Sequence, residues 1–475
     1  MAASRGRATD WILRLLLGVL VVGTIVVGGK SLLDDVISTA SHSYAPYSLV
    51  GTQLNATDSA EIVSVSCSSS LSCVAAGTGS SNESGAFLVE ERDGAWGGAT
   101  PINVSLPGAV GESAQSAVAS CWNPGDCTVI LSVTVEPDAA IYESTQVEAF
   151  SISERSGNWG SSRAILHTAN HPDFTALDCW GLGNCAIGWD GQSSAYVANE
   201  AGGVWQGPVP IAKHAGTLSA LACTRQGQCL AGAWESALNS RQPEQLAFAI
   251  GLNHGFWSVP YRIAARFLEG QNVEPSSAAC AGFYCQLVGT LVPSEKIKGA
   301  VKARSFSLGD LNGKIESPVE IGGEEQGIGV EMFGLSCWSP GDCEAVGQGS
   351  ISDRDQVGIG VTQHHGEWSR VNYLPATPNL LGSSINQVEC TRTGLCTGVI
   401  STAASGMWSV VGMRSLDLNR PLYSRQAVSF TPLALSCGGG STCVEGGFLS
   451  LTANSEAQND QAALTASTSG LFHTI

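Results

Sequence analysis

The sequence predicts an all-β fold: a β-propeller of eight four-stranded blades, preceded by one N-terminal transmembrane helix. Three observations predict it. The sixteen cysteines fall into eight local pairs, and the first cysteines of successive pairs lie 44 to 58 residues apart. Between the pairs, short segments of alternating apolar and polar residues are separated by glycine turns. A period of this length is typical of propeller blades, whereas a single-sheet solenoid repeats over roughly 20–30 residues.

Each cysteine pair predicts a hairpin closed by a disulfide. Residues i and i+6 can face each other across two antiparallel strands joined by a tight turn, which brings their Cβ atoms within disulfide range. The intervening residues are rich in Pro and Gly, as tight turns require. One pair is a residue closer and should form a different turn. The predicted disulfides are Cys67–Cys73, Cys121–Cys127, Cys179–Cys185, Cys223–Cys229, Cys280–Cys285, Cys337–Cys343, Cys390–Cys396 and Cys437–Cys443.

Two other roles for these cysteines are less consistent with the spacing. Zinc ligands are usually separated by two to four residues, with two such pairs close together. Here five residues generally intervene, and the pairs lie about fifty residues apart. Reduced core cysteines of a cytosolic protein would not require an even count or strict pairing. We therefore expect eight local disulfides and no metal site.

Residues 1–30 predict a membrane anchor. Arg5, Arg7 and Arg14 precede an uncharged apolar run from Leu15 to Gly29, and acidic residues follow it. This charge distribution places the N-terminus in the cytoplasm and exports the rest, giving a single-pass protein. Residues 31–46 would form a stalk, and residues 47–475 the propeller. A cleaved signal peptide, which would make the protein secreted, is the alternative.

The remainder of each repeat predicts four strands. The third strand ends in a glycine turn, with a tryptophan two residues beyond the turn glycine in most units. Unit seven lacks this pattern between Leu416 and Arg420, so a ring of seven blades is the alternative to eight. The last unit stops shortly after Phe472, before a complete fourth strand. Residues 47–54 are therefore predicted to pair with the last blade and close the ring.

Two groups of tryptophans have different predicted roles. Those after the glycine turns (Trp96, Trp159, Trp205, Trp257 and Trp368) recur at one repeat position, which favours packing between adjacent sheets over sugar stacking. Trp122, Trp180 and Trp338 instead lie inside disulfide-closed turns. These three are the candidate ligand face, although packing on the neighbouring blade is the favoured interpretation for them as well.

The sequence offers no catalytic constellation and predicts no cofactor. It contains neither a nucleophile elbow, nor a phosphate-binding loop, nor a dinucleotide fingerprint. The short motifs His171-Pro-Asp173 and Asp353-Arg-Asp355 lack the length of a metal-binding loop. The formal net charge of −18 argues against binding to nucleic acid.

The repeated serine-cysteine, five residues, cysteine pattern resembles that of exported bacterial β-propeller proteins with paired-cysteine repeats, chiefly actinobacterial. The resemblance covers about residues 47–475 and implies architecture, not activity. Asp93-Gly-Ala-Trp96 and the stretch from Ser153 to Trp159 also faintly resemble the Asp-box turn of sialidase-like propellers. The complete Asp-box string is absent, so no sialidase catalytic residue is assigned.

These observations support a membrane-anchored extracytoplasmic propeller that acts as a non-catalytic binding or scaffold module for an envelope protein or glycan. The alternative is a glycan-active hydrolase or lyase, because propellers can carry enzyme sites. A cluster of arginines and carboxylates at the mouth of the channel would favour the enzyme. A face lined by tryptophan would favour binding.

Overall fold

The structure is a computed structural model. It describes residues 48–49, 60–69, 71–79, 85–104, 109–137, 146–168, 173–191, 193–212, 214, 216–236, 245–263, 271–293, 303–322, 329–351, 355–374, 381–391, 394–402, 408–414, 417–418, 429–437, 442–450, 460–468 and 471–473. Contacts divide the chain into two units, Met1–Pro46 and Tyr47–Ile475. The predicted anchor and stalk lie outside the described residues. Within the described residues, no helix is both long and apolar enough to cross a membrane.

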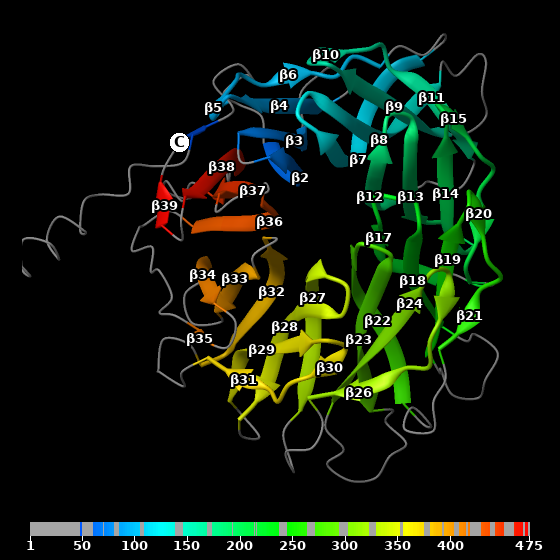
Figure 1. The fold of residues 1–475 in the computed structure, drawn as a ribbon. Helices are drawn as coiled ribbons and strands as arrows, with labels where there is room; N and C mark the ends of the chain where they lie inside the picture. Colours follow the sequence, from blue (N-terminus) through cyan, green and yellow to red (C-terminus); the bar gives the residue numbers. More distant parts are fainter. Residues whose placement is uncertain are drawn as a thin grey trace, which may run out of the picture. The chain divides into compact units, whose positions relative to one another are not determined.

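Unit two is all-β, and its described strands form eight antiparallel sheets (Figure 1). Each sheet is one blade, and the blades are numbered in chain order. The first strands are β2 (Ala60–Ser69), β7 (Ala109–Asn123), β12 (Asp173–Gly181), β17 (Gly216–Cys223), β22 (Gln271–Ala281), β27 (Val330–Ser339), β32 (Ser383–Cys390) and β36 (Ser429–Cys437). The second strands are β3 (Ser72–Gly79), β8 (Asp126–Pro137), β13 (Asn184–Asp190), β18 (Cys229–Ser236), β23 (Tyr284–Pro293), β28 (Asp342–Ser350), β33 (Leu395–Thr402) and β37 (Thr442–Ser450).

The third strand of each blade pairs with the second strand on one side and with the outermost strand on the other. These strands are β4 (Ala86–Arg92), β9 (Gln146–Arg155), β14 (Ala195–Ala201), β19 (Gln245–Asn253), β24 (Arg304–Leu311), β29 (Gln356–His364), β34 (Trp408–Arg414) and β38 (Asp460–Thr468). Blade seven therefore keeps its strands although its sequence has lost the glycine-tryptophan pattern. The described residues form eight blades, so the seven-blade alternative is wrong.

The fourth strand is interrupted, which the sequence did not predict. Its first piece follows the glycine turn: β5 (Ala95–Trp96), β10 (Asn158–Trp159), β15 (Val204–Trp205), β20 (Phe256–Trp257), β25 (Lys314–Ile315), β30 (Glu367–Trp368), β35 (Asp417–Leu418) and β39 (Leu471–His473). The second piece pairs with the same third strand farther along: β6 (Thr100–Pro101), β11 (Arg163–Thr168), β16 (Val209–Pro210), β21 (Tyr261–Arg262), β26 (Val319–Ile321) and β31 (Asn372–Tyr373). Glycine and proline, as in Gly207-Pro208, stand between the pieces of several blades and are unfavourable in a regular ladder.

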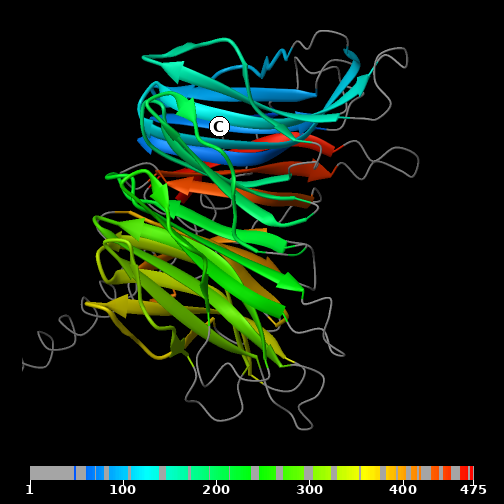
Figure 2. The same ribbon diagram turned by 90° about the vertical axis from the view of Figure 1, so that its right-hand side faces the viewer.

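The first strands of successive blades contact one another around a closed ring, from β2 through β7, β12, β17, β22, β27 and β32 to β36, which contacts β2 again. Figures 1 and 2 both show the blue first blade beside the red last blade. The predicted closing strand is confirmed at β1 (Ser48–Leu49), where Ser48 pairs with Leu464 and Leu49 with Ala463 of β38. The N-terminal end of unit two thus supplies the outer strand of blade eight.

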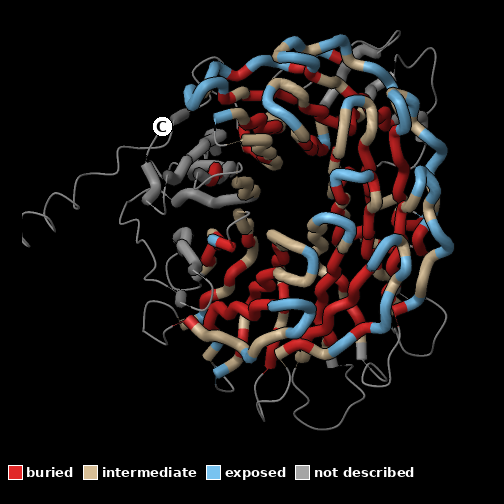
Figure 3. Tube along the Cα trace, viewed as in Figure 1, coloured by how far each residue is buried: buried red, intermediate tan, exposed pale blue. Residues whose placement is uncertain are grey.

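The hydrophobic core lies between adjacent sheets. One cluster joins Val74 and Leu88 of blade one to Val129 and Leu131 of blade two, and equivalent clusters follow around the ring. Figure 3 shows buried residues along the inner strands and exposed residues at the outer edge and the turns. The recurrent tryptophans pack against these clusters as predicted. Trp368 also donates its Nε1 hydrogen to Ser307 of the preceding blade at 2.8 Å.

Candidate ligand-binding face

All eight predicted disulfides are present, and no cysteine is free. Each joins directly opposed residues of the first and second strands, with Cα atoms 4.0–4.1 Å apart. The shorter Cys280–Cys285 pair closes a two-residue turn, with Ala281 opposite Tyr284. The second cysteine of every pair is at most 4% exposed. Eight disulfides indicate an extracytoplasmic domain.

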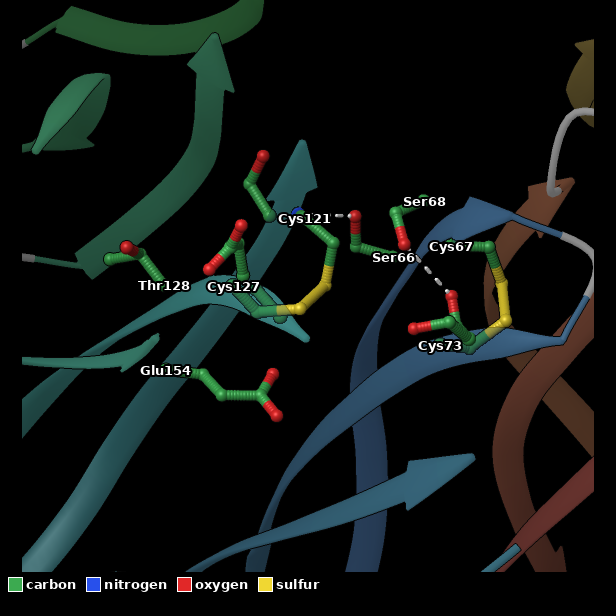
Figure 4. Close-up of a disulfide and its surroundings, with 12 residues drawn as sticks. Ser66, Cys67, Ser68, Cys73, Cys121, Cys127, Thr128 and Glu154 are labelled. Atoms are coloured by element: carbon green, nitrogen blue, oxygen red, sulfur yellow. Dashed lines mark hydrogen bonds between the residues drawn. A yellow bond between two sulfur atoms is a disulfide. The ribbon is translucent and has the colours of Figure 1, made fainter. Parts of the chain in front are cut away.

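In five of the eight blades, as far as the structure describes them, the residue before the first cysteine links its blade to the next; blades four and five have alanine at this position. The linking side chain accepts a hydrogen bond from the main-chain N–H of the next blade's first cysteine. Ser66 accepts from Cys121 at 2.9 Å (Figure 4), and Ser120 accepts from Cys179 at 2.9 Å. Asp178 continues the series with Cys223, Ser336 with Cys390 and Ser436 with Cys67. The serine-cysteine repeat is therefore a structural motif that joins blades around the axis.

Replacement of Ser120 by Ala is expected to reduce the free energy of unfolding by about 1–2 kcal/mol, because it leaves the buried Cys179 N–H without its acceptor. Ser120 itself is 5% exposed, so water cannot readily take its place. Urea denaturation measures the change, with Ser161→Ala on the exposed surface as the matched control. Equal stability of the two variants would contradict this role.

The same set of hydrogen bonds holds each of the three tryptophan-containing turns, at Trp122, Trp180 and Trp338. In each, the carbonyl of a glycine with positive φ accepts a hydrogen bond from a main-chain N–H of the outer turn, which joins the third and fourth strands of the same blade. Gly125 accepts from Gly157, Gly183 from Gly203 and Gly341 from Gly366, at 2.8–2.9 Å. The residue before the second cysteine adds a side-chain acceptor to the same outer turn, as Asp126 does for the N–H of Ser156 at 2.9 Å. The turn backbones are therefore held in place before any ligand binds.

These tryptophans meet at one cavity of about 480 Å³ on the axis of the ring. Its lining includes the first cysteines of seven blades, together with Asn123, Thr224 and Arg225. All three tryptophans are half-buried. Trp180 lies against Gly227 and Trp338 against Gly394, each on the following blade, so these rings both pack on a neighbour and line the cavity.

Two carboxylates project from opposite sides of the same ring of residues. Asp178 of blade three lines the cavity, and burial raises its pKa to about 6 although the N–H groups of Cys223 and Cys179 lower it. Burial, and then the charge of Asp178, raise the pKa of Glu389 of blade seven to about 7. Both residues are half-buried. The sequence did not single out either residue or Arg225, because only ring closure brings them together.

Exposed apolar side chains lie on the turns at one edge of blades three to five. The inner and outer turns of a blade lie at the same edge, since main-chain hydrogen bonds join them. Phe256 is 80% exposed and Val204 is 63% exposed on outer turns; Leu182 and Phe283 are exposed on inner turns. We use the name turn face for the surface formed by these exposed residues of blades three to five together with the three turn tryptophans of blades two, three and six. Such apolar side chains are typical of a surface that binds a partner.

The remaining candidate ligands of the sequence lie apart from the axial cavity. Among the described residues, no cluster of His, Cys, Asp and Glu could hold a metal ion. His254 and His365 occupy left-handed positions of two-residue turns, and His364 contacts Asp342 at 3.3 Å. Of the motifs 171–173 and 353–355, only Asp173 and Asp355 are described. The lining of the axial cavity combines one arginine with one carboxylate and three tryptophans.

No protein-family model matches the sequence, and no curated protein matches it. Solved structures similar to the chain include YCF48 bound to D1 peptide, with 12% identity, 75% of this chain and 90% of that chain covered, and a TM-score of 0.35. A PL25 ulvan lyase bound to its saccharide has 8% identity, coverage of 88% and 97%, and a TM-score of 0.45. NanB sialidase from Streptococcus pneumoniae has 8% identity, coverage of 88% and 93%, and a TM-score of 0.36. At these values the likeness carries no inference about activity or ligand.

Proposed function

We propose that residues 47–475 form a non-catalytic, extracytoplasmic binding module that engages an envelope protein through the turn face. The single observation that carries the proposal is the convergence of Trp122, Trp180 and Trp338, held by the same turn hydrogen bonds, at one axial cavity. The exposed Phe256 and Val204 on outer turns of blades four and three favour a protein partner, because apolar turn side chains gain most from burial in an interface. Residues 1–30 would anchor the module to the membrane.

Site-directed photo-crosslinking of the full chain in the source cells tests this proposal. A photoreactive phenylalanine at Phe256 is expected to form an adduct with one protein, identified by mass spectrometry. The same probe at Ile351, exposed at the opposite end of blade six, is the matched control and should form none. Combined Trp122→Ala, Trp180→Ala and Trp338→Ala substitutions should reduce the Phe256 adduct at least about tenfold.

Two results would overturn this proposal. One is equal labelling from both probe positions, and the other is an adduct that is insensitive to the tryptophan substitutions. A glycan-active hydrolase or lyase remains the alternative function. It predicts shortened saccharides when the purified chain is incubated with envelope polysaccharide.

A further inference from the structure

A second cavity, of about 670 Å³, lies between the outer parts of blades two and three. Its lining includes Arg155, Arg163 and Trp159 of blade two, and Glu200 and Trp205 of blade three. Both arginines are exposed, whereas Glu200 is only 8% exposed. The size lies within the usual range of about 300–1,000 Å³ for ligand sites. It shares no lining residue with the axial cavity, although Leu182 and Val204 of the turn face also line it.

The interface between blades one and two provides an internal comparison. There Arg92, which ends β4, contacts Glu154 of blade two at 3.1 Å and donates to the carbonyl of Gly157 at 2.8 Å. Glu154 is the cross-strand partner of Trp159. This arginine–glutamate pair joins the two blades directly.

Arg155 and Glu200 occupy the same repeat positions one blade later. Arg155 ends β9, and Glu200 is the cross-strand partner of Trp205. Within the part of the chain that the structure describes, no ion pair joins them, and the Oε2 atom of Glu200 is buried without a hydrogen-bond partner. The arginine and glutamate positions are thus retained between blades two and three, but the cavity lies where the contact would be.

A shortened side chain contributes to the opening. At the first interface, Trp159 donates its Nε1 hydrogen to Glu90. Ser153 is the counterpart of Glu90, because each accepts the main-chain hydrogen bond of the glycine just after the tryptophan, Gly97 or Gly160. Serine cannot extend as far as glutamate, and the Nε1 of Trp205 is buried without a described acceptor. Ser153 lines the cavity instead.

These groups define the chemistry of a ligand. Two guanidinium groups and one carboxyl give local positive charge in a chain with a net charge of −18, which favours an anionic group. Arginine forks match carboxylates in geometry. Asn158 and Ser161 of the lining are exposed and can exchange hydrogen bonds with hydroxyl groups. The partly exposed parts of Trp159 and Trp205 add apolar surface to the lining.

We propose that the cavity between blades two and three binds an acidic saccharide, namely a pyranose that carries a carboxylate and adjacent hydroxyl groups. Arg155 and Arg163 receive the carboxylate, while Asn158 and Ser161 contact hydroxyl groups. This inference does not depend on the protein partner proposed for the turn face.

Calorimetric titration of the detergent-solubilised full chain tests the site with four probes. Digalacturonate and 3′-sialyllactose carry the carboxylate, as a uronate and a sialate respectively, whereas digalactose and lactose are neutral counterparts. At least one acidic probe is expected to bind, and whichever binds identifies the source of the carboxylate. Combined Arg155→Gln and Arg163→Gln substitutions should weaken that binding at least about tenfold.

The matched control is Arg262→Gln, which removes a positive charge from exposed β21 of blade four and should not affect binding. The triple tryptophan variant of the turn face should also bind the acidic probe normally, which separates this site from the proposed function. Absence of binding by both acidic probes would overturn the inference. So would equal binding of the neutral probes, or unchanged affinity in the double arginine variant.

Discussion

Complete reduction of the eight disulfides is expected to lower the unfolding midpoint by roughly 15 °C. Each bridge closes a very short loop and contributes about 2 kcal/mol by constraining the unfolded chain, or about 16 kcal/mol if the contributions add. In a domain of this size, each kcal/mol corresponds to about 1 °C. Differential scanning calorimetry of oxidised protein and of protein reduced and alkylated after unfolding measures the change.

Pairing itself needs a separate check. Cys223→Ala should leave one free thiol, at Cys229, and mapping of non-reduced peptides should still find seven bridges between residues five or six positions apart. The remaining blades should fold normally, since each bridge lies within one hairpin. Bridges between blades, or a midpoint unaffected by reduction, would contradict the stabilising role of these hairpins.

Most of the fold could be predicted because its determinants are local in the sequence. A disulfide between residues six apart fixes the register of the hairpin formed by the first and second strands of a blade. The glycine turn fixes the hairpin formed by the third and fourth strands. Asp93-Gly94 and Asn312-Gly313 show why: both residues of each turn have positive φ, as a two-residue hairpin with the right-handed twist requires. The break in the fourth strand was not predicted. It depends on which fourth-strand residues fail to form hydrogen bonds with the third strand, such as β4, and no sequence pattern common to all blades marks them.

The candidate sites could be predicted only in part. Trp122, Trp180 and Trp338 share a visible context, a turn inside a disulfide loop, so the sequence distinguished them from the core tryptophans. Asp178 precedes the first cysteine of its repeat, a position at which most repeats have serine or alanine. Nothing else in the sequence around it marks a site. The cavity beside Arg155 and Glu200 depends on contacts between blades about fifty residues apart. An alignment of the repeats shows that these two positions correspond to Arg92 and Glu154, but the absence of contact between them is a property of the folded ring.

The protein is also expected to be more stable at pH 5.5 than at pH 7.5, with an unfolding midpoint higher by about 4–6 °C. Burial raises the pKa of Glu91, Glu154 and Glu344 to about 7, and the charge of Glu90 contributes at Glu154. Their unfolded-state pKa values lie near 4.3. The folded protein therefore binds more protons between about pH 4.5 and 7, so its free energy of unfolding falls as the pH rises through this range.

Glu344→Gln isolates one of these carboxyls. The side chain is 6% exposed, and its Oε2 accepts from the Thr362 hydroxyl at 2.7 Å, a hydrogen bond that the amide oxygen of glutamine can also accept. The variant should be more stable than the unmodified protein by about 1–2 kcal/mol at pH 7.5, and equal to it at about pH 3, where the carboxyl is neutral in both states. Glu367→Gln, on the exposed turn of the same blade, is the matched control and should change nothing. A midpoint that stays constant or falls on acidification to pH 5.5 would show that these carboxylates are already compensated by partners in the folded ring, and that burial does not set their protonation.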